Sequence, residues 1–263
     1  MPISTIDQYI AAAKQSINIV KTGARTTVAA AWFTTFDLTG APGAGVLAGT
    51  STTAGVVPSD ATAGTLPINT FGVGNVGYVA NVDFGSSVAC RLKLFDMLWK
   101  AGAYAFNANQ ALTAQPSYAA RVPDLNYSDC QLWFEAVTAF TGNPTVTITY
   151  TNQDGVTGRT ATLSPGLAPT VGRLIPVPLQ AGDTGVQKVD NVVATAATAG
   201  TFNLLVLRPV WTGRARLAND GDTHGPLQTG MAQVYDSSAL ILAVNADSTA
   251  LGVPELELVV ANG

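Results

Sequence analysis

Residues 145–160 read TVTITYTNQDGVTGRT, and this stretch decides the expected fold class. Its first six residues alternate between threonine and an apolar side chain, so an extended strand would carry all its apolar groups on one face. Asp154 and Gly155 follow, a pair that favours the positive φ angles of a tight hairpin turn. Residues 156–163 then supply a partner strand. The stretch therefore predicts an antiparallel β-hairpin.

Similar strand-like runs, separated by Gly, Pro, Asn and Asp, occupy most of the chain beyond residue 25. They are Thr27–Phe36, Tyr78–Phe84, Val88–Leu98, Gln131–Phe140, Gly185–Ala194, Phe202–Val210, Ala239–Val244 and Leu256–Ala261. Residues 95–99 also fit a helix. The regular strand–helix alternation of a doubly wound fold is missing. We therefore expect a mainly β protein, an antiparallel β-sandwich or jelly roll.

The N-terminal segment has a different period. Its apolar residues recur at intervals of four and three: Ile6, Ile10, Ala13, Ile17 and Val20. Ser4 and Asp7 resemble a capping box, and Gly23 stands where a C-cap glycine would follow. This predicts an amphipathic helix over residues 1–24. Its apolar stripe would pack either on the helix's own domain or against another subunit.

Residues 40–71 form a long stretch rich in Gly, Ala and Thr, and no Lys or Arg occurs between Asp37 and Cys90. A flexible linker would be polar, but this stretch contains Val46, Leu47, Val56, Val57, Leu66, Ile68 and Phe71. It fits an extended arm that docks on a partner, or an ordered loop that packs on its own domain. The expected division is a helix (1–24), an arm with a connecting strand (25–76) and a β body (77–263).

Composition limits the function. The chain has 263 residues, 13 basic against 17 acidic side chains and a net charge of −4, which disfavours a nucleic-acid binder. Only 11% of residues are charged, against a typical ~25%, so we expect either a neutral surface of Thr, Ser, Asn and Gly or a surface largely covered by neighbours. We expect no signal peptide and no membrane span. Cys90 and Cys130 form no metal or disulfide pattern, and we expect both to be free and buried.

Enzyme motifs are weak. His224 is the single histidine, and its neighbours Asp220 and Asp222 lack the downstream glutamate of a calcium loop, so this segment reads as a polar turn. Residues 72–77 spell GVGNVG, but a strand-like run follows where a dinucleotide site needs a helix. Two of the three glutamates, at positions 255 and 257, share the expected solvent face of a strand. We expect no enzyme, no cofactor and no small-molecule substrate.

One basic cluster stands out. Arg208, Arg214 and Arg216 flank Trp211, a grouping found in single-strand nucleic-acid sites and in protein–protein hot spots. Because the chain is acidic overall, we expect a protein partner and no nucleic acid. Pairing of some of these arginines with Asp220 and Asp222 is the structural alternative.

The run RLKLFDMLW at residues 91–99, followed by the hairpin at 145–160, resembles a group of virion structural proteins of tailed bacteriophages. The resemblance covers about residues 78–210. It implies a component of the virion shell and transfers no catalytic residue.

Together these features predict a capsid decoration (cement) protein, made in the host cytoplasm and bound to the capsid surface. Its expected partners are the major capsid protein or other virion proteins and further copies of itself, with no membrane. The candidate contact residues are Ile6, Ile10, Ile17, Val56, Leu66, Phe71, Arg208, Trp211, Arg214 and Arg216. A tail, neck or baseplate component, a host-glycan-binding protein and a major capsid protein are the alternatives.

Overall fold

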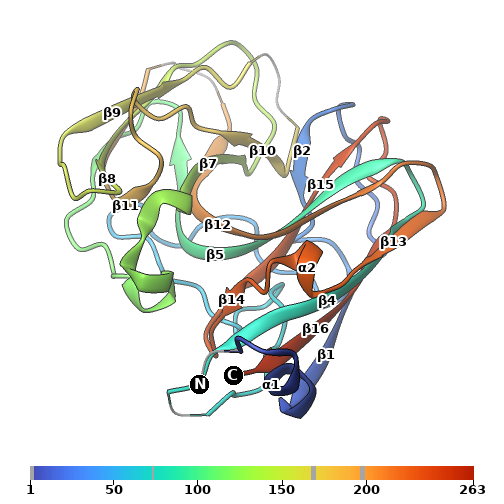
Figure 1. Cartoon of the computed structure of the whole chain (residues 1–263). Coiled ribbons are helices and arrows are strands. Elements are labelled where there is room, and N and C mark those ends of the chain that lie inside the picture. The colour runs from blue at the N-terminus through green and yellow to red at the C-terminus, as the bar shows by residue number, and fades with distance from the viewer. Residues whose placement is uncertain (1–2, 73, 167–169, 196–198) are drawn as a thin grey trace. The chain divides into compact units, whose positions relative to one another are not determined.

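The computed structural model describes residues 3–72, 74–166, 170–195 and 199–263. It is mainly β, with antiparallel strand pairs, and divides into two compact units. Unit 1 contains Met1–Gly45, Ser59–Asp96 and Val210–Gly263, and unit 2 contains Val46–Pro58 and Met97–Pro209. The chain passes between the units after Gly45 and after Pro58, and again within two long strands, β5 (Cys90–Ala105) and β12 (Thr201–Ala215) (Figure 1). The division therefore does not follow the expected linear boundaries.

The larger sheet of unit 1 has the strand order β13-β4-β16-β1-β3, with β14 also paired to β4. These strands are β1 (Lys14–Lys21), β3 (Gly40–Ala41), β4 (Gly77–Ser86), β13 (Asp220–His224), β14 (Gln233–Val234) and β16 (Pro254–Asn262). The first and last strands of the chain are partners, with Lys14 opposite Ala261. In β16, Glu255 and Glu257 are exposed and the leucines between and after them are buried, as the alternation predicts.

A second ladder of unit 1 joins β2 (Trp32–Thr34), β15 (Leu240–Ala246) and the first half of β5. A short helix, α2 (Pro226–Thr229), lies next to β4 and β13. The core of unit 1 fills with side chains such as Phe33, Leu92, Leu94, Trp211 and Leu258. The strand expected over Val88–Leu98 is confirmed, and the helical alternative for residues 95–99 is excluded, because β5 runs through this segment without a break.

Unit 2 contains the expected hairpin. Strands β8 (Val146–Asn152) and β9 (Arg159–Leu163) pair with Val146 opposite Leu163 and Tyr150 opposite Arg159. Gly155 in the turn has φ +77°, a conformation that glycine adopts easily. Strands β6 (Asn109–Ala111) and β11 (Val186–Ala194) complete a sheet with the order β6-β11-β8-β9.

A second ladder of unit 2 joins β10 (Arg173–Pro176), β7 (Gln131–Ala136) and the first half of β12. Three single-turn 3₁₀ segments precede β7: η1 (Ala119–Arg121), η2 (Pro123–Leu125) and η3 (Tyr127–Asp129). Aromatic rings fill the core, with Phe134 stacked on Phe202 at a centroid distance of 5.0 Å. The eight long expected strand runs all contain a strand, whereas a sandwich or jelly-roll arrangement stays a prediction.

The expected N-terminal helix is wrong beyond residue 11. Helix α1 covers only Ile6–Ala11, and residues 14–21 form β1 instead. Ile17 and Ile19 point into the core of unit 1, with the residues between and beside them less buried. Residues 17–20 read INIV, and β-branched side chains of this kind favour strands because they restrict χ1.

The caps of α1 also differ from the expectation. Thr5 is the N-cap, and it forms a capping box with Gln8 in place of Ser4 with Asp7. Gly23 lies beyond β1, where its backbone N–H donates to the Thr39 carbonyl at 3.2 Å.

The long stretch at residues 40–71 packs on its own chain, as the second of the two expectations had it. Residues 46–58 belong to unit 2, where Val56 bridges to Lys100 and the Trp99 indole donates to the Ala54 carbonyl at 3.1 Å. Gly55 faces the Trp99 ring so closely that a Cβ would lie 2.4 Å from it. Residues 59–71 belong to unit 1 and bury Leu66 in its core.

Candidate interaction surfaces

Helix α1 is held by local hydrogen bonds at both of its ends. At the start, the Gln8 backbone N–H donates to Thr5 Oγ1 at 3.2 Å, and the Thr5 backbone N–H donates to Gln8 Oε1 at 3.0 Å. At the end, Lys14 Nζ donates to the carbonyls of Tyr9 and Ala12 at 2.8 and 3.1 Å. An isolated helix of six residues is marginal in water, so α1 depends on these terminal hydrogen bonds for its stability.

The apolar face of α1 is uncovered. Ile6 and Ile10 are 74% and 69% exposed, and no residue of the helix is buried. Ile17, which the expected helix would have placed on the same stripe, lies in the core of unit 1 instead. Two adjacent isoleucines one helical turn apart thus form a small apolar surface, which we call the α1 face.

The candidate contact residues within 40–71 likewise include both buried and partly exposed side chains. Leu66 and Phe71 are buried in the core of unit 1, so they offer no surface to a neighbour. Val56 is 37% exposed, and its backbone pairs with Lys100 of unit 2. Burial within unit 1 therefore explains why Leu66 and Phe71 are apolar, without a docking partner.

The expected basic cluster is split by burial. Arg208 in unit 2 and Trp211 in unit 1 are both buried, since consecutive residues of β12 face opposite sides and this stretch is covered on both. Arg214 lies near the end of β12, where alternate side chains are exposed, and Arg216 directly follows the strand. Neither guanidinium pairs with Asp220, whose carboxylate accepts the backbone N–H groups of Arg216 and Leu217 at 3.1 and 3.4 Å.

Arg214 and Arg216 line a cleft of about 640 Å³ together with Arg91 from β5. We call this site, completed by Thr212, Gly213, Asp222 and His224, the arginine cleft. The strands that carry it are neighbours, as the 3.2 Å hydrogen bond from Thr212 Oγ1 to the Leu92 carbonyl shows. Arg214 reaches Asp247 at 3.9 Å, whereas the guanidinium groups of Arg91 and Arg216 have no ion-pair partner among the described residues.

His224 forms part of the wall of the arginine cleft. The indole Nε1–H of Trp211 donates to His224 Nδ1 at 3.0 Å. The rings of Phe84 and His224 pack in a T-shaped arrangement, with their centroids 5.1 Å apart. Because Nδ1 accepts a hydrogen bond, the neutral ring carries its proton on Nε2. The cleft is therefore rich in hydrogen-bond donors, and Asp222 is its one carboxylate among the lining residues.

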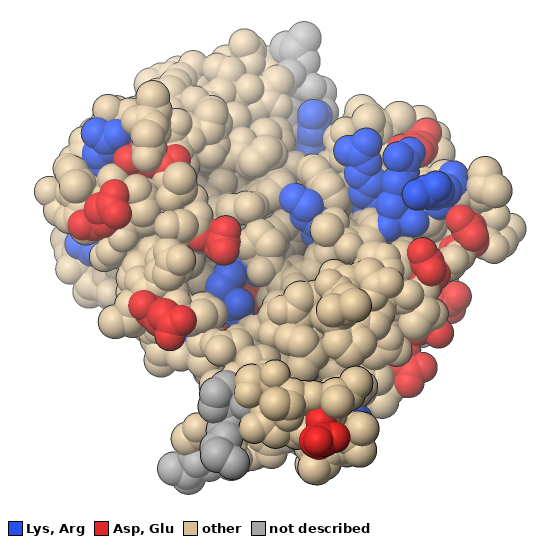
Figure 2. All heavy atoms as spheres, in the orientation of Figure 1, with Lys and Arg blue, Asp and Glu red and all other residues tan. Residues whose placement is uncertain are grey.

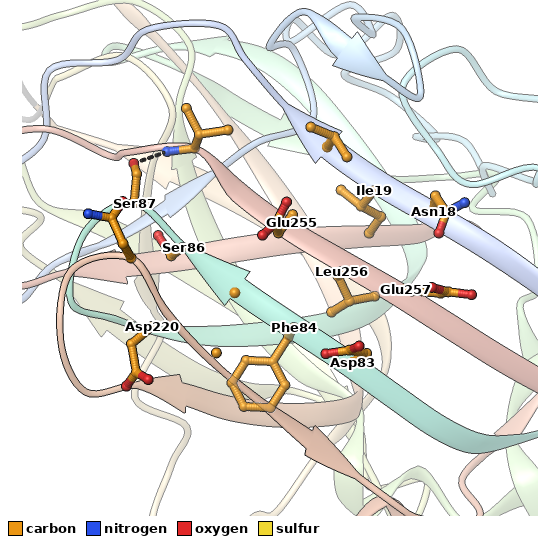
Figure 3. A pocket seen from close by; sticks show the side chains of 15 residues that line it. Asn18, Ile19, Asp83, Phe84, Ser86, Ser87, Asp220, Glu255, Leu256 and Glu257 are labelled. Atoms are coloured by element: carbon orange, nitrogen blue, oxygen red, sulfur yellow. Dashed lines mark hydrogen bonds between the residues drawn. The ribbon is translucent and has the colours of Figure 1, made fainter.

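A second site lies on the outer face of the larger sheet of unit 1. It is a trough of about 580 Å³, lined by Asp83, Asp220, Glu255 and Glu257 among others, and we call it the acidic trough. Figure 3 shows Asp83 and Glu257 on neighbouring strands, with Glu255 further along β16. Its lining residues include no Lys, Arg or His. Ser16 Oγ donates to Glu257 Oε1 at 2.6 Å.

The two sites lie on either side of the edge strand β13, which gives Asp220 to the trough and Asp222 to the cleft. In Figure 2, blue side chains gather in the region that β13 and β15 occupy in Figure 1, and red side chains follow the adjoining edge. Unit 1 thus presents two surfaces of opposite charge.

The weaker chemical candidates lie in or beside strands. The polar turn expected around His224 is wrong, because residues 220–224 pair with β4 and form β13. Residues 72 and 74–77 lead directly into β4, and no helix follows them; residue 73 lies outside the described residues. Among the described residues, no group of three His, Cys, Asp or Glu side chains is arranged to hold a metal ion. Cys90 and Cys130 are free and buried, as expected, and burial raises the pKa of the Cys90 thiol. Within the described part of the chain, no helix has the length and apolarity to cross a membrane.

Three of the four tryptophans, Trp99, Trp133 and Trp211, are buried, as their apolar surroundings predict. Trp32 is half-buried, with Lys93 Nζ 5.2 Å above its ring. The pKa of Lys93 is lowered by its own burial.

No family model and no curated protein matches the sequence. Among solved structures, the chain is similar to the structure of infectious bursal disease virus Gx strain, with 8% identity, a TM-score of 0.20, and coverage of 95% of this chain and 80% of that one. It is also similar to the VP2 subviral particle of infectious bursal disease virus, with 12% identity, a TM-score of 0.18, and coverage of 99% and 82%. Likeness at this level carries no argument about function.

Proposed function

We propose that this chain is a structural protein of a tailed-phage virion, a decoration protein that binds the assembled lattice of the major capsid protein. The observation that carries the proposal is the α1 face, an apolar surface on a capped helix that buries nothing on its own chain. The resemblance of residues 91–99 and 145–160 to virion structural proteins supports it. The proposal assigns no catalytic step, cofactor, nucleic acid or membrane to the chain.

Binding would stabilise the capsid through linkage. A protein that binds the assembled shell and not its free subunits shifts the assembly equilibrium toward the shell. Contacts repeated over the lattice add avidity, because every further contact of a bound copy is intramolecular. The protein would be made in the host cytoplasm and act on the capsid surface.

The test replaces both isoleucines of the α1 face with aspartate. Ile6→Asp with Ile10→Asp leaves the fold intact, because both side chains are exposed and the caps of α1 are unchanged. Deleting residues 1–24 is a poorer test, since it also removes β1 from the centre of a sheet. Burying two isoleucines contributes about 3 kcal/mol or more, so affinity for shells of the same phage should fall at least roughly a hundredfold.

The matched control is Leu227→Asp, which places the same charge on α2 at a leucine that is 97% exposed. We expect this variant to occupy expanded shells like the wild type, as measured by co-sedimentation. Undiminished occupancy by the α1 variant would remove the α1 face from the mechanism. Location of the protein on the tail by electron microscopy, or binding to host glycans without binding to shells, would favour the alternative functions.

A further inference from the structure

The arginine cleft and the acidic trough have complementary charge. Three guanidinium groups line the cleft, from Arg91, Arg214 and Arg216, and three exposed residues, Asp83, Glu255 and Glu257, bring carboxylates to the trough. These six groups are a large part of the charge of a chain with only 13 basic and 17 acidic residues. In a protein so poor in charge, two surfaces of opposite charge need an explanation.

Neither surface is neutralised within the molecule. Asp83 and Glu257 are directly opposite on β4 and β16, and like charges in this position repel each other. On the cleft side, Arg214 makes a long ion pair at the surface, and the Arg91 and Arg216 guanidinium groups have no ion-pair partner among the described residues. A basic group arriving at the trough, or an acidic one at the cleft, would relieve repulsion that the isolated molecule retains.

The shape of the trough admits a long side chain. Gly85 and Gly221 form part of its lining and carry no side chain into it. A Cβ at Gly221 would lie 2.5 Å from the Phe84 carbonyl oxygen, and a Cβ at Gly85 would lie 3.0 Å from Glu255 Oε1. Arginine suits such a site because its planar guanidinium donates to a carboxylate in a bidentate arrangement.

We infer that the arginine cleft of one copy binds the acidic trough of a second copy of this chain. The inference rests on the proposed function, in which copies lie beside one another on one shell. A nucleic acid fits less well, because Asp222 lies in the cleft and the acidic trough adjoins it across β13, where both repel phosphate. A contact between two different surfaces can continue from copy to copy or close into a ring.

The test is a charge swap between two double variants. One carries Arg214→Glu with Arg216→Glu, and the other carries Glu255→Lys with Glu257→Lys; all four positions are exposed, so both variants should fold. Self-association of the full chain is measured by sedimentation velocity at low and high salt. We expect the wild type to associate, and each variant alone to associate at least roughly tenfold more weakly.

Mixing the two variants should restore association. The reversed, acidic cleft of the first variant complements the reversed, basic trough of the second, and the wild-type cleft of the second variant complements the wild-type trough of the first. Matched controls change the same charge elsewhere on the surface: Lys188→Glu for the first variant and Asp154→Lys for the second. Both controls should associate like the wild type. High salt should weaken the wild-type contact, since surface charges are screened over about 10 Å at 0.1 M salt.

Absence of wild-type association, or failure of the mixed variants to associate, would overturn the inference. So would arginine-dependent binding of a short DNA duplex without association between copies. Shell occupancy is measured separately with the α1 variant, which retains both charged surfaces. Loss of shell binding with intact association between copies, or the reverse, shows which of the two proposals has failed.

Discussion

The two units differ in how they treat a glutamate: Glu135 of unit 2 is paired inside its own unit, whereas Glu257 of unit 1 lies at the surface. Glu135 is buried in unit 2, where it accepts a 2.7 Å hydrogen bond from Asn203 Nδ2 and lies 3.9 Å from Lys100 Nζ. Glu257 of unit 1 is exposed and lies opposite another carboxylate. Glu135 thus helps to hold unit 2 together, whereas the exposed Glu257 carboxylate is available for the contact that we propose between copies.

The internal pairing in unit 2 also holds residues 46–58 in place. Lys100 Nζ donates to the Val46 carbonyl at 3.1 Å, and Asn203 Nδ2 donates to the Leu47 carbonyl at 2.7 Å. The backbone N–H of Gly49 donates to Asn203 Oδ1 at 2.9 Å. A segment with little secondary structure is therefore fixed by buried polar side chains rather than by a strand ladder.

The largest expected effect comes from breaking this network with Glu135→Ala. The change leaves Lys100 buried without its carboxylate partner and removes an acceptor from Asn203. Removing one partner of a buried ion pair costs about 3–5 kcal/mol, and we expect the free energy of unfolding to fall by that amount in urea titrations. A loss below about 1 kcal/mol would show that unit 2 does not depend on the network.

A second internal network joins the β8–β9 hairpin to Asp183. The carboxylate accepts hydrogen bonds from Arg159 Nε, Tyr150 Oη and Asn152 Nδ2 at 2.8, 2.6 and 2.7 Å. These hydrogen bonds lower the pKa of Asp183 to about 2; the one from Arg159 has the largest effect, and those from Asn152 and Tyr150 add to it. Since its ordinary pKa is 3.8, the stabilisation is present above pH 4 and is lost as the pH falls toward 2.

Asp183→Asn should lower the free energy of unfolding by about 2–3 kcal/mol at neutral pH, because charge-assisted hydrogen bonds are lost. The difference from the wild type should shrink between pH 4 and pH 2, as followed by circular dichroism during denaturation. The matched control is Asp190→Asn, which removes a more exposed pair with Lys188 and should cost less than about 1 kcal/mol at either pH. A pH-independent difference would contradict the assigned cause.

Unit 1 also contains internally satisfied charges, such as the ion pair of Arg25 with Asp37 at 2.6 Å, and the buried Lys21 is another. Its ammonium donates to the carbonyls of Leu38 and Pro42 at 3.1 and 2.7 Å, and burial lowers its pKa to about 8, against the opposing effect of Asp37. The unfolded chain keeps the ordinary pKa of 10.5, so above pH 8 the unfolded state binds more protons and stability rises with pH. Lys21→Met removes this contribution.

The measured quantity is the difference in unfolding free energy between wild type and Lys21→Met. It should shift in favour of the wild type by up to about 2 kcal/mol between pH 8 and 9.5, at 1.36 kcal/mol per pH unit. Using the difference cancels the opposite effect of Cys90, whose raised pKa reduces stability over the same range in both proteins. A constant difference would show that Lys21 keeps its ordinary pKa.

The smallest expected effect concerns the surface charges. Glu257→Thr removes the repulsion with Asp83 and also removes the acceptor of Ser16 Oγ, so the free energy of unfolding should change by less than about 0.5 kcal/mol. Thermal melts of the isolated protein at low protein concentration measure it. A fall in the free energy of unfolding of more than about 1 kcal/mol would mean that Glu257 stabilises unit 1, as Glu135 stabilises unit 2, and would contradict the contrast between them.

The sequence predicts the strands well because the alternation of side chains is local. The same logic misplaces residues 14–21, since Ile17 and Val20 fit a helical stripe while Ile17 and Ile19 fit a strand. The run of β-branched residues there was the available signal for a strand. The helix that remains, α1, keeps Ile6 and Ile10 as the exposed pair.

The arginine cleft could be predicted only in part. Arg214 and Arg216 are two residues apart at the end of one strand, so their common face follows from the sequence. Arg91 joins them from a strand more than one hundred positions earlier, through a strand pairing that no local pattern encodes. The burial of Arg208 and Trp211 depends in the same way on which elements cover β12.

The pairing of the first and last strands in unit 1 has a consequence for protein engineering. Because Lys14 lies opposite Ala261, a short linker could join the two ends of the chain without crossing the body of unit 1 (Figure 1). New ends could then be opened in the exposed turn at Asp154 and Gly155. Such a circular permutant would hold α1 by covalent connections on both of its sides, and would offer the hairpin turn as a place to attach cargo.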